Sequence, residues 1–151
     1  LTRSSAASDV YKRQAWGSLG IAEECYNIAL KYAKEREQFG KPIAGKQLIQ
    51  KKLVDMITEI TKSQLICYRL GKIMDSGKID YRQISMAKRN NVKIASDIAK
   101  EARQILGGMG ITSDFSIMRH MINLETLITY QGTNEMHLLI TGRDITGIDA
   151  F

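Results

Sequence analysis

With 151 residues, one proline, 12 glycines and 44% hydrophobic residues, the chain has the composition of a single all-α domain with a sizeable core. No apolar stretch approaches the roughly 18 residues that span a bilayer, so we expect no membrane insertion. The net charge is +6, and the basic residues are interleaved with acidic ones along the chain. This pattern favours solvated helix faces over a nucleic-acid interface, and the positive charge also suits an anionic cofactor or thioester.

The first 14 residues differ from the rest of the chain. They are rich in serine and alanine and lack the apolar repeat of a packed helix. We interpret residues 1–14 as a tail, foreign to the domain or disordered, and expect the domain to occupy residues 15–151.

Five helices are predicted after the tail, because apolar residues recur at spacings of three and four. In the third helix this pattern places Ala87 inward and Lys88 and Arg89 outward. We expect Ser113 or Asp114 to be the N-cap of the fourth helix. The predicted helices cover about residues 15–38, 46–76, 80–106 and 115–128, and a last one starts after Thr133.

Long amphipathic helices joined by short turns predict an antiparallel four-helix-type bundle. The second and third helices, of about 27 to 31 residues, exceed the usual length of globular helices and favour a scaffold or an oligomer interface.

The cysteines and histidines show no metal-binding pattern. Cys25 and Cys67 lack CxxC spacing, and we interpret both as buried thiols outside any disulfide. His120 and His137 lie far from any acid-rich cluster, so we expect no metal site.

The turn Thr129–Thr133 between the last two helices is one candidate binding site. Gly132 has no Cβ, which allows a ligand to approach the backbone closely, and Thr133 adds a hydroxyl. The same residues also suit a turn that only ends one helix and caps the next.

Two further clusters are candidates for binding a phosphate-containing cofactor. Arg36 is followed by Gln38, Phe39 and Gln47, and its guanidinium suits a pyrophosphate, although it also suits an exposed helix end. A glycine-rich turn follows the third helix. It either exposes its backbone to a cofactor or only ends the helix. That cluster comprises Gln104, Ile105, Leu106, Gly107 and Gly108.

Five segments, in their order and spacing, resemble the C-terminal helical domain of acyl-CoA dehydrogenases, and most closely the glutaryl-CoA dehydrogenases. They are AWGSLGIAEECYNIAL, KEREQFGKPIAGKQLIQKKLVDMITEIT, KRNNVKIASDIAKEARQILGGMGI, RHMINLETLITYQGTNEMH and LITGRDITGIDAF. An unrelated helical interaction module is the alternative that periodicity alone supports.

This resemblance implies a homotetrameric FAD enzyme whose N-terminal helical and middle β domains are absent from the sequence. Such enzymes remove hydrogen from the α and β carbons of an acyl-CoA thioester and pass electrons to an electron-transferring flavoprotein. Glutaryl-specific members, which act in amino-acid catabolism, also decarboxylate the product to crotonyl-CoA. The implied location is the mitochondrial matrix in a eukaryote and the cytoplasm in a bacterium.

The resemblance also assigns site residues. Gly132 would meet the substrate thioester, and Gln131 occupies the position of the catalytic glutamate in the family's Tyr-Glu-Gly-Thr motif. The residues implied to bind FAD are Arg36, Gln38, Phe39, Gln47, Gln104, Ile105, Leu106, Gly107, Gly108, Thr133 and Phe151.

Two positions depart from the family pattern. Gln131 is a neutral amide, which cannot act as the general base that the family's glutamate provides. A catalytically impaired flavin-binding or structural homologue is therefore the alternative function. Met109 stands where the family's Gly-Gly-Asn-Gly turn has asparagine.

Overall fold

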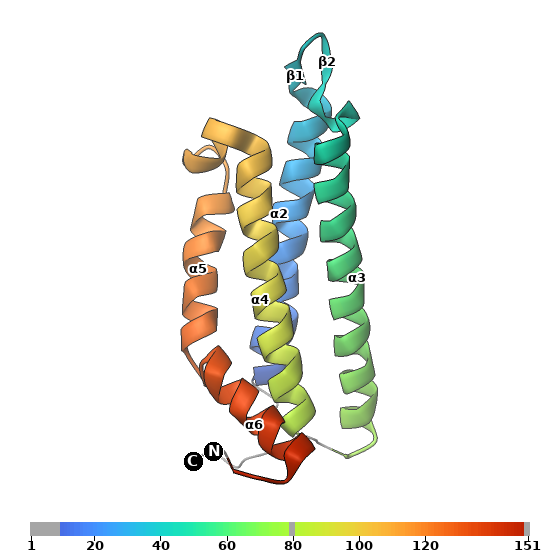
Figure 1. Ribbon diagram of the computed structural model, residues 1–151, viewed down its shortest axis with the longest axis vertical. Coiled ribbons are helices and arrows are strands. Elements are labelled where there is room, and N and C mark those ends of the chain that lie inside the picture. Colours follow the sequence, from blue (N-terminus) through green and yellow to red (C-terminus); the bar gives the residue numbers. More distant parts are fainter. Residues whose placement is uncertain (1–9, 79–80, 150–151) are drawn as a thin grey trace.

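A computed structural model describes residues 10–78 and 81–149, and this part of the chain is almost entirely helical (Figure 1). The all-α prediction is therefore confirmed. The α-helices of the described residues are α2 (Trp16–Glu35), α3 (Gln47–Asp75), α4 (Tyr81–Leu106), α5 (Ile117–Thr129) and α6 (Asn134–Thr146).

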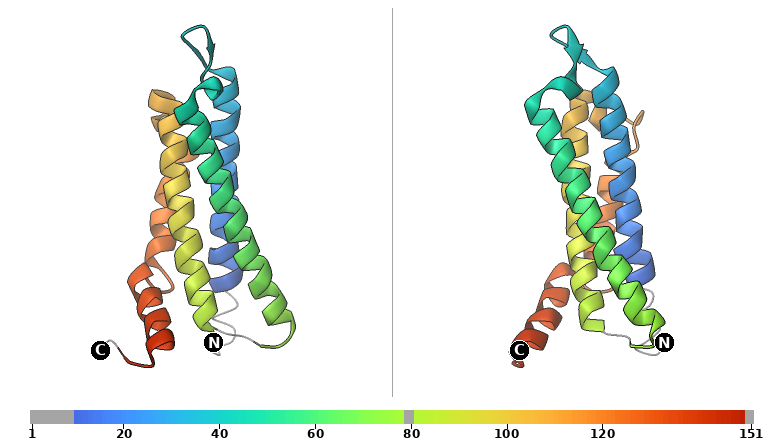
Figure 2. Two further views of the ribbon diagram at one scale, coloured as in Figure 1. Left: turned by 45° about the vertical axis from the view of Figure 1, so that its right-hand side comes forward. Right: turned by 90° about the vertical axis from the view of Figure 1, so that its right-hand side faces the viewer.

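Helices α2 to α5 form an antiparallel bundle, in agreement with the predicted architecture (Figures 1 and 2). Helix α4 is its central member and packs against α2, α3, α5 and α6. Helix α6 leaves the end of α5 at an angle and lies across the lower part of α4 (Figure 1).

The short elements were not predicted from the sequence. Strands β1 (Glu37–Gln38) and β2 (Lys41–Pro42) form a two-residue hairpin between α2 and α3. Its polar residues are all exposed, so no apolar alternation marks it. The remaining elements are the π-helix η1 (Val10–Ala15) and the 3-10 helices η2 (Ile43–Gly45) and η3 (Gly107–Ile111).

The predicted N-cap of α5 is wrong. The cap is Ser116, and its side chain makes no capping hydrogen bond, so neither Ser113 nor Asp114 fulfils that role. Instead the Thr112 hydroxyl donates to an Asp114 carboxylate oxygen at 3.3 Å, within the loop that precedes the helix.

The main core lies between α2 and α4, where both helices present small residues. Ala22, Ala29 and Ala33 on α2 are fully buried, as are Ala95 and Ala99 on α4. Such small side chains allow two helix backbones to approach closely, and larger residues from α3 and α5 complete the cluster. Cys25 and Cys67 are both buried and neither forms a disulfide, as predicted.

The described end of the predicted tail is packed. Residues 10–15 form η1, Val10 packs against a second hydrophobic cluster, and the Gln14 side chain is fully buried. Residues 1–9 lie outside the described residues, and the origin of the tail stays a prediction. Among the described helices, none combines the length and the apolar character that crossing a bilayer requires.

Candidate functional site

A cavity of about 770 Å³ opens at the hairpin end of the bundle, between the last turns of α2 and α4. It gathers most of the residues predicted to bind the cofactor from two distant parts of the sequence. Gln47, the exposed first residue of α3, is not among the residues that line the cavity. The predicted residues that line it are Arg36, Gln38, Phe39, Gln104, Ile105, Leu106, Gly107 and Gly108.

The cavity offers positive charge and an aromatic ring. Arg36 is the residue that follows the last turn of α2, and in the described residues neither it nor Lys46 forms an ion pair. Phe39 has a φ of 56° and is 92% exposed at the hairpin tip, with the Lys46 ammonium 5.2 Å from its ring centroid. This arrangement suits an anionic ligand that carries a flat ring.

The glycines that end α4 differ in what they require. Gly107 has a φ of 58°, the left-handed conformation of a helix stop. A Cβ at Gly110 would lie 2.4 Å from the Arg103 carbonyl oxygen, so packing demands glycine there. Gly108 has an ordinary φ and open space beside it, so it leaves bare backbone on the cavity wall.

The turn between α5 and α6 is a second site with an unusual backbone. Gln131 has a φ of 54° and Gly132 a φ of 96°, and the Gln131 side chain is exposed. A non-glycine residue in the left-handed region stores strain that its surroundings must hold. Thr133 is the N-cap of α6, where its hydroxyl accepts from the Met136 N–H at 3.4 Å.

His137 lies buried beneath this turn. A Cβ at Gly132 would lie 2.9 Å from Nε2 of His137, so the imidazole gives a packing reason for the glycine in addition to ligand access. Burial and the nearby Lys88 charge lower the pKa of His137, while the backbone of Gln131 and Gly132 opposes that shift. The imidazole is therefore neutral near pH 7.

Lys88 was wrongly predicted to face outward. Its side chain is fully buried, and its ammonium donates to the carbonyl oxygens of Tyr130, at 3.0 Å, and Gly132. Burial lowers its pKa from 10.5 to about 8. Lys88 lies four residues from both Ile84 and Val92 in the apolar stripe of α4, and this spacing could have predicted its inward position.

The two sites lie at opposite ends of the bundle. Lys88 contacts the α5–α6 turn, whereas Gln104, further along α4, lines the cavity. The step of 16 positions from Lys88 to Gln104 corresponds to a rise of about 24 Å along the helix. One chain therefore does not bring the cavity and the turn into a single site.

Other predicted features have simpler outcomes. The Gln131 amide oxygen accepts from the Gln14 amide at 2.5 Å. Phe151 lies outside the described residues. Within those residues no group of three His, Cys, Asp or Glu side chains is placed to hold a metal ion.

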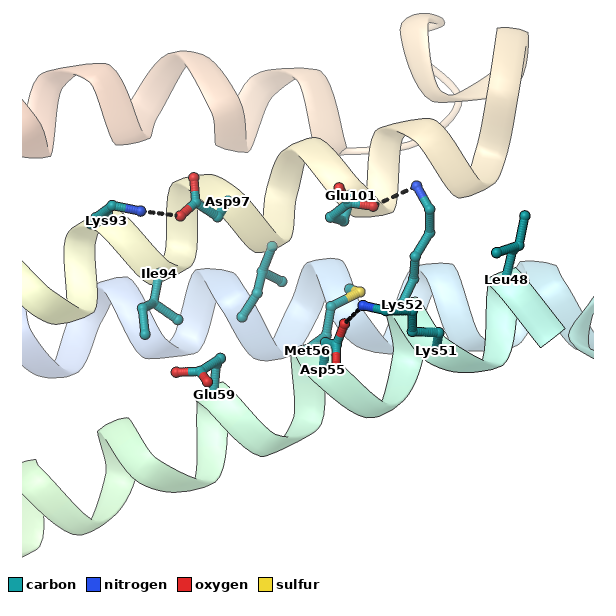
Figure 3. A pocket seen from close by; sticks show the side chains of 11 residues that line it. Leu48, Lys51, Lys52, Asp55, Met56, Glu59, Lys93, Ile94, Asp97 and Glu101 are labelled. Atoms are coloured by element: carbon teal, nitrogen blue, oxygen red, sulfur yellow. Dashed lines mark hydrogen bonds and ion pairs between the residues drawn. The ribbon is translucent and has the colours of Figure 1, made fainter.

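A groove of about 500 Å³ between α3 and α4 contains none of the predicted site residues (Figure 3). Its apolar lining includes Leu48, Met56 and Ile94. The charged residues along it form ion pairs, among them Lys52 with Glu101 at 2.5 Å. Because its charged groups are already compensated, the groove suits apolar contacts better than an anionic ligand.

The chain as a whole is similar to solved structures of known enzymes. Glutaryl-CoA dehydrogenase from Mycobacterium smegmatis is 45% identical and superposes with a TM-score of 0.94, over 97% of this chain and 38% of that one. A structure of a glutaryl-CoA dehydrogenase from the same organism in complex with FADH2 is 44% identical, with a TM-score of 0.89 over 91% of this chain and 36% of that one.

Sequence relatives extend the comparison. The mitochondrial 2-methylacyl-CoA dehydrogenase of Solanum tuberosum is 36% identical over 131 residues, which cover 87% of this chain and 32% of that protein. The chain thus spans about a third of the length of its relatives. Residues 13–146 match the profile of the acyl-CoA dehydrogenase C-terminal domain, and the chain belongs to the acyl-CoA dehydrogenase family.

Proposed function

We propose that this chain is the FAD-binding and oligomerisation part of an enzyme that dehydrogenates an acyl-CoA thioester at its α and β carbons. The observation that carries the proposal is the cavity in which Arg36 meets the glycine-rich end of α4. Its cationic and aromatic groups fit the pyrophosphate and a ring of FAD, and the FADH2 complex of a similar enzyme supports this cofactor.

Each cofactor site in the intact protein needs two subunits. The cavity, with Arg36, Gln38 and Phe39, would hold the pyrophosphate and adenosine side of one FAD. The turn with Gln131, Gly132 and Thr133 would face the flavin and the thioester of another. The separation of about 24 Å along α4 supports this division and, with it, the expected homotetramer. Gln47 and Phe151 remain proposed cofactor contacts.

Glutaryl-CoA is the proposed substrate, with decarboxylation to crotonyl-CoA. The likeness to the Mycobacterium smegmatis enzymes supports it, whereas the relative from Solanum tuberosum acts on 2-methylacyl-CoA. An electron-transferring flavoprotein is the proposed electron acceptor. The proposed location is the mitochondrial matrix in a eukaryote and the cytoplasm in a bacterium.

In this site the chain's own residues position the substrate. Gly132 exposes backbone to the thioester, and Thr133 with the N-terminus of α6 faces the flavin. FAD, when bound, accepts the hydride that leaves the β carbon. Removal of the α proton needs a general base, and the amide of Gln131 cannot serve as one.

The second candidate function is that of a catalytically impaired flavin-binding or structural homologue. The observation that favours it is the Gln131 side chain, which is neutral and hydrogen-bonded to Gln14. This candidate keeps the cofactor cavity and loses proton abstraction.

The proposal is tested on the full-length protein that contains this chain, here called the parent. The parent is purified, analysed for FAD and titrated with glutaryl-CoA. We expect a yellow protein whose Gln131→Glu variant bleaches with glutaryl-CoA about 10² to 10⁴ times faster than the parent. A folded parent that cannot be reconstituted with flavin contradicts the proposal. Equal bleaching in both proteins means that position 131 does not limit the chemistry.

A further inference from the structure

Lys88 is a buried cation that the proposed mechanism does not use. Its side chain is fully buried in α4, and no carboxylate in the described residues forms an ion pair with it. An uncompensated buried ammonium costs several kcal/mol in typical proteins unless polar groups surround it. Here its partners are the backbone carbonyls of Tyr130 and Gly132.

These two carbonyls lie on either side of residue 131. The ammonium therefore holds the backbone both before and after the residue that stands in the strained left-handed conformation, with a φ of 54°. His137 supports the same turn from beneath Gly132, and the Thr133 cap joins it to α6. Three side chains thus fix the turn: Lys88 from α4, His137 from α6, and Thr133 at the end of the turn itself.

We propose that Lys88 is a positioning residue of the dehydrogenase site, whose two bonds to the turn hold the side chain at position 131 toward the substrate. This inference rests on the proposed function, because it assigns Lys88 to the same site. Misplacement of a reacting group by about 1 Å typically costs about 10²-fold in rate, so a two-point anchor of this kind has a measurable effect.

A purely structural alternative exists for the same contacts. Carbonyls at the C-terminal end of a helix lack intrahelical partners, and a cation there satisfies them and complements the helix dipole. In that case the loss of Lys88 would weaken the packing of α5 without a specific effect on residue 131. The two roles differ in whether the loss of Lys88 changes the rate of flavin reduction per folded molecule.

The test uses the full-length flavoprotein in the Gln131→Glu background, with Lys88→Met and Lys88→Arg as variants. Lys100→Met is the matched control, because Lys100 is an exposed lysine on the same helix. For each variant we would measure the rate of flavin reduction by glutaryl-CoA, the Kd for glutaryl-CoA, and amide hydrogen exchange over residues 129–136.

We expect Lys88→Met to slow flavin reduction at least 10-fold with a Kd within about threefold, and to accelerate exchange in the turn. Lys88→Arg, which keeps the cation, should recover part of the rate, and Lys100→Met should behave like its parent. If Lys88→Met changes neither rate nor exchange in the turn, the inference is overturned. Accelerated exchange throughout the bundle, with an unchanged rate per folded molecule, also overturns it.

Lys88→Arg decides the question if Lys88→Met does not fold. The longer guanidinium must shift the carbonyls that it reaches, so we expect a slower flavin reduction than in the parent, and a parental rate overturns the inference. If the full-length protein does not bind FAD, the proposed function is rejected. The inference about Lys88 can still be tested in that case, because hydrogen exchange can be measured without flavin. Unchanged exchange in that flavin-free protein also overturns the inference.

Discussion

The imidazole of His137 occupies the space that a side chain at Gly132 would need. A Cβ at position 132 would lie 2.9 Å from Nε2, closer than real Cβ atoms approach other heavy atoms, and the φ of Gly132 is 96°. Glycine at this position therefore satisfies a conformational and a packing requirement at once. The backbone of the proposed substrate turn depends on the histidine below it.

Gly132→Ala is expected to destabilise the protein by about 2 to 4 kcal/mol, because it adds backbone strain to a clash. Urea unfolding would measure the change. The matched control is Gly142→Ala in α6, where a new Cβ meets nothing within 4 Å. That substitution should be neutral or stabilise the helix by about 0.5 to 1 kcal/mol.

A double-mutant cycle with His137→Ala separates the two causes. Removing the imidazole should relieve the clash and leave the strain, so the cost of Gly132→Ala should be smaller in that background. An equal cost in both backgrounds would show that the clash contributes nothing.

The stability of the protein should fall as the pH decreases through 6.5. Burial, with the Lys88 charge, lowers the pKa of His137 in the folded state, so below 6.5 the unfolded chain binds more protons than the native one. One such group contributes a slope of up to about 1.4 kcal/mol per pH unit. We expect His137→Asn to flatten the decline in unfolding free energy between pH 7.5 and pH 5.5.

His120→Asn is the comparison variant for this measurement, because His120 is expected to contribute to the same pH dependence. Burial also lowers the pKa of His120, followed by the effect of the Arg119 charge, while Glu24 opposes it. Each single variant should remove only part of the pH dependence. If His137→Asn retains the full decline of the parent, His137 is not a source of it.

Both native cysteines should resist thiol reagents. Burial, with a contribution from the Glu24 charge, raises the pKa of Cys25 to about 12. Burial raises that of Cys67 to about 11, against the hydrogen bond from Asn91. The thiolate fractions at pH 8 are then about 10⁻⁴ and 10⁻³, and only the thiolate is reactive.

Reaction with a chromogenic disulfide at pH 8 would check this prediction. We expect two thiols per chain to react after unfolding and neither to react promptly in the native protein. Thr61→Cys, on the exposed face of α3, supplies a positive control that should react within minutes. Prompt reaction of two thiols in the folded parent would contradict the predicted burial.

The 151-residue chain alone should show no dehydrogenase turnover. It spans about a third of its relatives, and the proposed cofactor site needs parts of other domains and of a second subunit. An assay with glutaryl-CoA and a dye acceptor would measure this, with the full-length protein as the control. Turnover by the chain alone would show that the cavity and the turn suffice.

The sequence by itself determined the helices and the family resemblance. Apolar residues repeat along each helix with the period of its turns, and this local pattern predicted the long helices to within a few residues. The burial of both cysteines was predicted from the absence of CxxC spacing, and the structure confirms it. The hairpin was missed because its four paired residues are all exposed and show no apolar alternation.

Only the tertiary structure decided how the candidate residues are grouped. It joined Arg36 to the end of α4 in one cavity and separated both from the turn at Gln131. Lys88 was predicted to be a surface charge. Its partners could not be predicted from the sequence, because they are carbonyls of a turn 42 residues later. Backbone carbonyls are present at every residue, so their meeting with one ammonium depends on how α4, α5 and α6 pack.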